Sequence, residues 1–194
     1  MATDKGPEWL EPRDLPALFG NERFVGLDAS VQDFWRFALP DLRMNNARGY
    51  LAEFLVHQAL GVDAVRVEWG DADVLWGDVA IEVKSSAYLQ SWAQRVPSRI
   101  QFTGLRARRW NPRRGYEVNS GFKADVYVFA VQVARDHGAY DPLDVSDWRF
   151  YVLARSVLEE LNQSSMTLTK VERHTSAVPF GQLRAAVERA TLAY

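Results

Sequence analysis

Three residues around a predicted turn have the types and spacing needed to bind a metal ion. Asp73 precedes the dipeptide Gly77-Asp78, and Glu82 and Lys84 follow it. A two-residue loop with glycine at its first position is typical of a type II′ β-hairpin. In that hairpin Asp73 lies directly opposite Glu82, and Lys84 shares their face. Opposed carboxylates repel each other at neutral pH unless a cation lies between them, so this register indicates a cation site with oxygen ligands.

A third acidic residue, Glu53, lies on the helix predicted just before the hairpin. It is the only acid of that helix, and its neighbours one turn away are mostly apolar. One interpretation is an ordinary helix glutamate that pairs with His57, four residues later. The other is a carboxylate linked to the metal site, which the facing pair Asp73 and Glu82 favours. We expect His57 itself to be structural.

These residues resemble the motif of the PD-(D/E)XK nuclease superfamily. Asp73 matches its metal-binding aspartate, Glu82-Val83-Lys84 matches its (D/E)-x-K element, and Glu53 occupies the place of its frequent helix glutamate. The run IEVKSSAYLQSW is also similar to stretches of uncharacterised bacterial members. Ala72 stands where the motif has proline, and many members of this divergent group also lack that proline. The motifs cover residues 43–92 only.

The resemblance implies a restriction endonuclease-like fold, a three-layer α/β domain whose central mixed β-sheet is flanked by helices. It also implies a nuclease that depends on Mg²⁺, with Mn²⁺ as a substitute. Lys84 would orient the attacking water or stabilise the anion, and Gln90 would orient the site or serve the structure alone. The groups that would hold the metal are Asp73, Glu82, Glu53 and the carbonyl of Val83.

A basic segment follows the motif. Residues 83–116 contain Lys84 and seven arginines but no acid, so in a chain of net charge −2 the remainder carries −10. Such asymmetry indicates one basic face for a polyanion, although a solvated surface is the alternative. The arginines expected to contact nucleic acid are Arg95, Arg99, Arg106, Arg108, Arg109, Arg113 and Arg114.

Composition limits the classes of protein. The 194 residues are 47% hydrophobic, enough for one domain, which we place at residues 27–194 after an arm of residues 1–26. No apolar run suits a signal peptide or a membrane span, so we expect a cytoplasmic protein without a membrane partner. The absence of cysteine excludes disulfides, thiol catalysis and cysteine-bound zinc, and the three histidines are scattered.

The remaining elements follow from periodicity and breakers. Ser30 should cap a helix that Pro40 stops, and Asn45 or Asn46 should cap the helix of Glu53, which ends at Gly61. The second hairpin strand can run to Ala87. We further predict strands at 65–69, 100–103, 124–133 and 148–153, a loop at 111–123, the start of a helix at 157–161, an ambiguous strand at 166–171 and a helix at 180–193.

We therefore predict a metal-dependent endonuclease that acts on DNA. Two alternatives stay open: a nucleic-acid-binding or assembly protein that kept the scaffold without catalysis, and a nuclease directed at RNA. Many nucleases of this kind cut two strands as dimers, so a homodimer is a further expectation.

Overall fold

The computed structural model describes residues 10, 15–68, 70, 72–108, 110–111, 113 and 115–192. The chain divides into two compact units, residues 1–40 and residues 41–194. This boundary follows the first helix, whereas the sequence suggested a boundary at residue 26. We describe each unit by itself, and the candidate site lies in the larger one.

The smaller unit contains helix α1 (Val31–Ala38). Ser30 caps it as predicted: its hydroxyl accepts the Asp33 N–H, and the Asp33 carboxylate accepts the Ser30 N–H. This reciprocal pair satisfies two N–H groups that the first turn leaves without helical partners. The helix ends before Pro40, which also agrees with the prediction.

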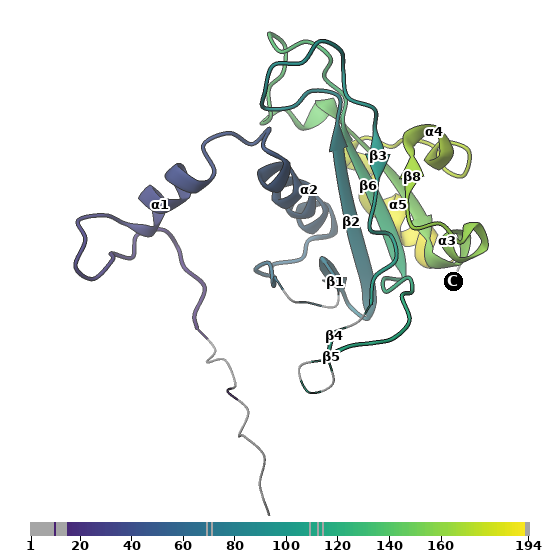
Figure 1. Cartoon of the computed structure of the whole chain (residues 1–194), viewed down its shortest axis with the longest axis horizontal. Helices are drawn as coiled ribbons and strands as arrows, with labels where there is room; N and C mark the ends of the chain where they lie inside the picture. The colour runs from purple at the N-terminus through teal and green to yellow at the C-terminus, as the bar shows by residue number, and fades with distance from the viewer. Residues whose placement is uncertain are drawn as a thin grey trace, which may run out of the picture. The chain divides into compact units, whose positions relative to one another are not determined.

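A four-stranded mixed sheet is the centre of the larger unit (Figure 1). Its strand order is β1-β2-β6-β7, and only β2 and β6 run parallel. Every residue of β6 is buried, which explains its unbroken apolar sequence, because a central strand meets packed side chains on both faces. The strands are β1 (Val74–Trp76), β2 (Val79–Ala87), β6 (Val126–Gln132) and β7 (Trp148–Ala154).

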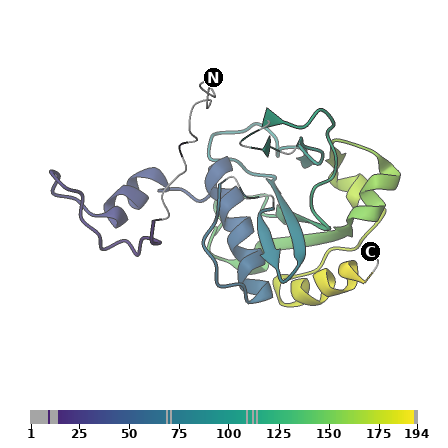
Figure 2. The ribbon, with the colours of Figure 1, turned by 90° about the horizontal axis from the view of Figure 1, so that it is seen from below.

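Both faces of this sheet are covered. Helices α2 (Asn45–Leu60) and α5 (Leu183–Thr191) form one hydrophobic core with the sheet face that carries Ile81 and Val83 (Figure 2). The opposite face packs against a second layer that centres on Phe102 and Leu158. The unit is thus mixed α/β with helices on both sides of the sheet. The second layer contains β3 (Gln101–Phe102), α3 (Arg155–Leu161), β8 (Met166–Thr167) and α4 (Leu168–Val171).

Several predicted elements differ from the structure. Residues 65–68 form no strand, and residue 69 lies outside the described residues. Residues 166–171 are a strand for two residues and then turn into helix α4. The predicted loop 111–123 contains part of a small hairpin, β4 (Trp110–Asn111) with β5 (Gly115–Tyr116). Short 3-10 turns, η1 (Val145–Asp147) and η2 (Phe180–Gln182), complete the fold.

The two ends of α2 show which local signals held. Gly61 ends the helix in the left-handed conformation, φ +69°, as predicted. The predicted asparagine cap is wrong, since the N-cap is Met44 and no side chain caps the helix. Asn45 instead accepts a hydrogen bond from the buried guanidinium of Arg48, at 2.5 Å. In the part of the chain that the structure describes, no helix is long and apolar enough to cross a membrane.

Candidate active site

The β1–β2 hairpin has the register that the sequence predicted. Val74 pairs with Ile81 and Trp76 pairs with Val79 around a two-residue loop. Gly77 has φ +58°, which suits the first loop position of a type II′ turn. The same register, carried on by one pair, places Asp73 opposite Glu82. An arrangement in which Asp78 opposes Glu82 is therefore excluded.

Asp73 lies at the open edge of β2. Strand β1 pairs with β2 only as far as Ile81, and beyond that point the Asp73 carboxylate accepts the Val83 N–H at 2.7 Å. The N–H and C=O of one strand residue point to the same side of the strand, so the Val83 carbonyl also faces this edge. Asp73 and the Val83 carbonyl thus present oxygen atoms along one short stretch of backbone.

Glu82 and Lys84 form an ion pair on β2. The Lys84 Nζ lies 2.6 Å from the Glu82 Oε1, and the two side chains are 24% and 20% exposed. The chain that leaves β3 passes close to this lysine: a Cβ added to Gly104, which has φ +66°, would lie 3.9 Å from Nζ. The glycine therefore keeps the space beside the ammonium group free of side chain.

Glu53 is paired with an arginine that the sequence analysis missed. Its Oε2 accepts a hydrogen bond from the Arg66 Nε at 2.7 Å, and only 13% of the Glu53 side chain is exposed. The expected alternative partner, His57, instead places its Nε2 3.4 Å from the backbone oxygen of Asp73. Arg66 belongs to the stretch that alternation assigned to a strand, so no sequence signal connected it with the site.

The acids from three elements influence one another. The pKa of Asp73 is raised to about 6, mainly by burial and also by the negative charges of Glu82 and Glu53, against the Val83 hydrogen bond, which lowers it. Burial also raises the pKa of Glu53, where Arg66 opposes the shift and Glu82 adds to it. Each carboxylate thus lies within electrostatic range of the others in a poorly solvated region, where like charges disfavour ionisation.

The donor set suits a hard divalent cation, because it consists of carboxylates and a backbone carbonyl. Within the described residues, however, no three His, Asp or Glu side chains converge tightly enough to hold a metal ion. Glu82 is directed to Lys84 and Glu53 to Arg66. The donor atoms are thus of the type that Mg²⁺ prefers, but two of the carboxylates are paired with cationic side chains of the protein.

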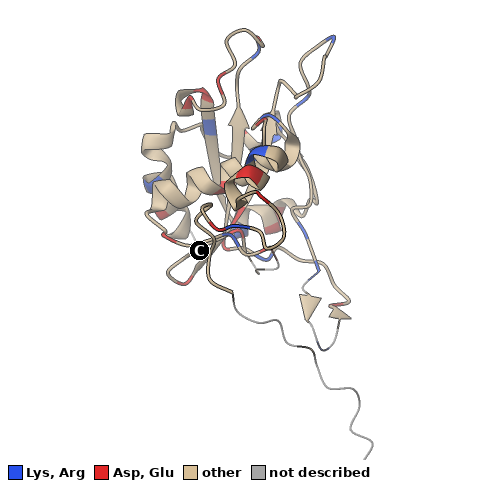
Figure 3. Ribbon diagram, turned by 90° about the vertical axis from the view of Figure 1, so that its left-hand side faces the viewer, with Lys and Arg blue, Asp and Glu red and all other residues tan. Residues whose placement is uncertain are grey.

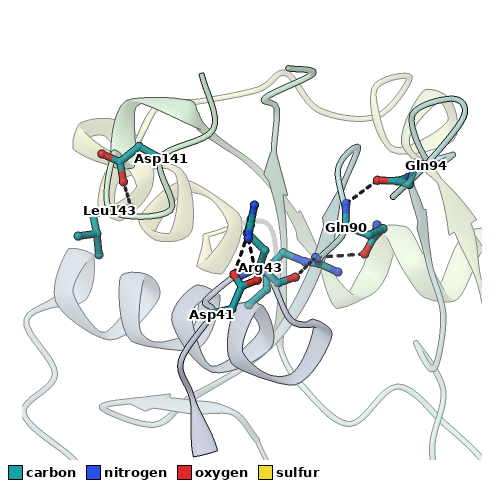
Figure 4. A network of polar contacts seen from close by, with 7 residues as sticks. Asp41, Arg43, Gln90, Gln94, Asp141 and Leu143 are labelled. Atoms are coloured by element: carbon teal, nitrogen blue, oxygen red, sulfur yellow. Dashed lines mark hydrogen bonds and ion pairs between the residues drawn. The ribbon is translucent and has the colours of Figure 1, made fainter. Parts of the chain in front are cut away.

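Gln90 contacts the loop after β2. It is buried, and its Nε2 donates to the Ala87 carbonyl at 3.1 Å. Its backbone N–H donates to Gln94 at 2.7 Å (Figure 4). Its Oε1 accepts from Arg48 of α2 at 3.3 Å. None of its hydrogen bonds within the described chain reaches Asp73 or Glu82. Gln90 thus fastens the end of β2 to the helix that carries Glu53.

The predicted arginines fall into two groups. Four are exposed, namely Arg95, Arg99, Arg108 and Arg113, and none of these forms an ion pair with another described residue. Arg106 is half-buried and donates to Asn162 at 2.7 Å and to the Ser120 carbonyl at 2.9 Å, which occupies its guanidinium. Basic positions lie along the loop that leads to the β4–β5 hairpin (Figure 3). Arg109 and Arg114 lie outside the described residues.

Comparisons of the chain with protein-family models, with curated proteins and with solved structures found no match. Neither the fold family nor the activity therefore has support from a relative. What the protein does must be argued from the carboxylates, the lysine and the basic surface.

Proposed function

We propose that the larger unit is a metal-dependent nuclease, with a divergent restriction endonuclease-like fold, that hydrolyses phosphodiester bonds in DNA. One observation carries the proposal: carboxylates from α2, from the residue before β1 and from β2 lie within electrostatic range of one another near the open edge of β2, beside Lys84. Perturbed carboxylates grouped with a lysine are more typical of a functional site than of a purely structural one.

Phosphodiester hydrolysis requires an activated water and neutralisation of the charge that develops on the phosphate. A bound Mg²⁺ ion would supply both, as a Lewis acid that lowers the pKa of a coordinated water. In this proposal Asp73 and Glu82 would hold the metal, the Val83 carbonyl would supply a third oxygen, and Glu53 would assist them. Mn²⁺ should substitute because it accepts the same ligands.

Lys84 has the role of a positioning and stabilising cation. Its ammonium group lies two residues from Glu82 on the same face, and Gly104 leaves the neighbouring space without a side chain. If Glu82 held the metal, Lys84 would be free to donate to the attacking water or to a phosphate oxygen. The exposed arginines Arg95 and Arg99 would hold the backbone of the nucleic acid away from the site of cleavage.

One observation favours a second candidate, a catalytically inactive nucleic-acid-binding protein on the same scaffold. Glu82 and Glu53 each have a cationic partner in the chain, so the acids could serve as a structural ion cluster without metal. A fold that supports a nuclease does not by itself imply activity. The two candidates differ in whether the protein cleaves nucleic acid at all.

A cleavage assay of the full chain tests the proposal. Supercoiled DNA, single-stranded DNA and RNA are each incubated with the protein in Mg²⁺, Mn²⁺ or EDTA. We expect cleavage of DNA that EDTA abolishes and that Glu82→Gln removes. Cleavage of RNA alone would keep the chemistry and change the substrate. No cleavage of any substrate, together with unchanged nucleic-acid binding by Glu82→Gln, would favour the inactive scaffold.

A further inference from the structure

Residues 62–68 connect α2 to the candidate site and bring Arg66 to its edge. This connector has no helix or strand, and the backbone N–H groups of residues 63–68 donate no hydrogen bond within the described chain. The side chains of Val65 and Val67 are each 66% exposed. Few backbone contacts therefore hold the connector in place.

The Arg66 side chain is what anchors it. The guanidinium donates from Nε to Glu53 at 2.7 Å and from Nη1 to Glu68 at 2.5 Å, and it lies over the Tyr50 ring, 4.7 Å from the centroid. Only 35% of this side chain is exposed. Three contacts around one guanidinium therefore hold a segment that has little other support.

Arg66 donates to a Glu53 oxygen that the proposed metal or its waters would also need. A guanidinium that donates to Glu53 and a divalent cation near the same oxygens compete for one partner, and the two cations repel each other in this poorly solvated region. In the chain without metal, Arg66 offsets part of the repulsion among the three acids.

We propose that Arg66 is a built-in counter-ion of the carboxylate cluster, and that binding of a divalent cation displaces it and releases the connector. This inference rests on the proposed function, because it assumes that the carboxylates bind metal. We call residues 62–68 the gate, because their position would depend on whether the metal is bound. The gate makes metal binding weaker than the carboxylates alone would allow.

Metal affinity is the first test, and it requires no cleavage. We expect Arg66→Gln to bind Mn²⁺ about tenfold more tightly than wild type in isothermal titration calorimetry, because a competing like charge is removed. Arg184→Gln is the matched control. Arg184 also pairs with a glutamate, Glu188 at 3.1 Å, and lies over an aromatic ring, that of Trp76. The control makes the same change of net charge and should leave the affinity unchanged.

Limited trypsin digestion of the wild type is the second test and needs no variant. Trypsin cleaves after arginine, and an Arg66 held by Glu53, Glu68 and Tyr50 should be a poor site. We expect Mn²⁺ to increase the rate of cleavage between Arg66 and Val67 several-fold, and EDTA to reverse the increase. Cleavage after Arg95, which has no ion pair to lose, measures any general effect of Mn²⁺ on the protease.

The outcomes separate the gate from the nuclease. Tighter Mn²⁺ binding by Arg66→Gln but not by Arg184→Gln, with metal-dependent cleavage after Arg66, supports the gate. If Asp73→Asn weakens Mn²⁺ binding and Arg66→Gln leaves it unchanged or also weakens it, the gate is overturned. The proposed nuclease then remains. Absence of Mn²⁺ binding in wild type and in Arg66→Gln would overturn both.

Discussion

Two ion pairs of the larger unit, one on β2 and one between the residue before β6 and the first residue of α3, look alike but have different surroundings. The Glu82–Lys84 pair spans 2.6 Å with side chains 20% and 24% exposed, and the Asp125–Arg155 pair spans 2.7 Å with side chains 25% and 22% exposed. Length and burial therefore do not distinguish them. Any difference in role must come from the groups around each pair.

Around Asp125 the polar groups are satisfied. Its second oxygen accepts the Ala80 N–H at 2.9 Å, and Arg155 also donates to the carbonyls of Ala124 at 2.8 Å and Lys123 at 3.2 Å. This network ties the start of β6 to β2. Glu82, in contrast, has two further carboxylates, Asp73 and Glu53, within electrostatic range.

The role of an ion pair therefore depends on the charged and polar groups around it. A pair whose remaining donors and acceptors are occupied contributes to folding, and removal of one partner costs stability. A pair with further carboxylates around it is disfavoured by their repulsion and is a candidate for chemistry. Four experiments test this distinction.

The largest expected difference is in catalysis. Glu82→Gln and Lys84→Ala should each lower Mg²⁺-dependent DNA cleavage by roughly 100-fold or more, because the first loses a metal ligand and the second a cation beside the phosphate. Asp125→Asn should stay within about threefold of wild type at a temperature where it is folded. Plasmid nicking measures all three, and Lys84→Ala should still bind DNA. An equal loss in Asp125→Asn would remove the contrast.

Stability should show the opposite order. Asp125→Asn should lower the free energy of unfolding by about 1–3 kcal/mol, because the charge that pairs with Arg155 is lost from a half-buried network. Urea denaturation in EDTA at pH 7.5 measures the change. A value close to zero would show that the Asp125 network is not a structural one.

Asp73→Asn should stabilise the metal-free protein at pH 7.5, by on the order of 1–2 kcal/mol. The pKa of Asp73 is about 6 in the folded chain, above the value of roughly 4 expected when unfolded. Between these values the folded state binds a proton that the unfolded state has released, so wild-type stability falls as pH rises through this window. The asparagine oxygen can still accept the Val83 N–H, so only the charge is removed.

The pH dependence is the check on that effect. In urea denaturation with EDTA, the advantage of Asp73→Asn over wild type should grow from about pH 4 to pH 6 and then level off. Mg²⁺ should stabilise wild type but not the variant. A variant that is less stable than wild type at pH 7.5 would mean that the ionised Asp73 carboxylate stabilises the hairpin, which contradicts the prediction.

The smallest effect concerns the arginines. Arg95→Ala with Arg99→Ala should lower DNA affinity several-fold and reduce the slope of log affinity against log salt by about 2, one counter-ion for each lost phosphate contact. Arg106→Ala should leave that slope unchanged and lower the melting temperature, because its guanidinium holds Asn162 and Ser120. Filter binding at four salt concentrations separates the two. Equal slopes would reduce the exposed arginines to a solvated surface.

Local signals predicted the parts of the site that are local in sequence. The Gly77-Asp78 turn fixed the register, and with it the position of Asp73 relative to Glu82, because side-chain alternation leaves no freedom once the loop length is known. Lys84 follows Glu82 on the same face for the same reason. The buried strand β6 was evident from its unbroken apolar run.

Contacts between distant elements were beyond the sequence. The partner of Glu53 is Arg66, and that choice depends on how the connector folds back over α2, which the alternation of residues 65–69 misrepresented as a strand. Arg106 had the same composition signal as Arg99, yet its guanidinium donates to Asn162 from another element, a contact that the sequence did not predict. Tertiary packing decided both cases, and neither charge pattern nor periodicity carries that information.

The shortness of β1 limits how two copies of this protein could associate. Because β1 stops opposite Ile81, the edge of β2 near Val83 is closed by a carboxylate and not by a strand. Addition of a strand from a second chain at this edge would cover Asp73 and the Val83 carbonyl, and the charges there discourage it. If the protein cuts DNA as a homodimer, its dimer interface must therefore lie on another surface.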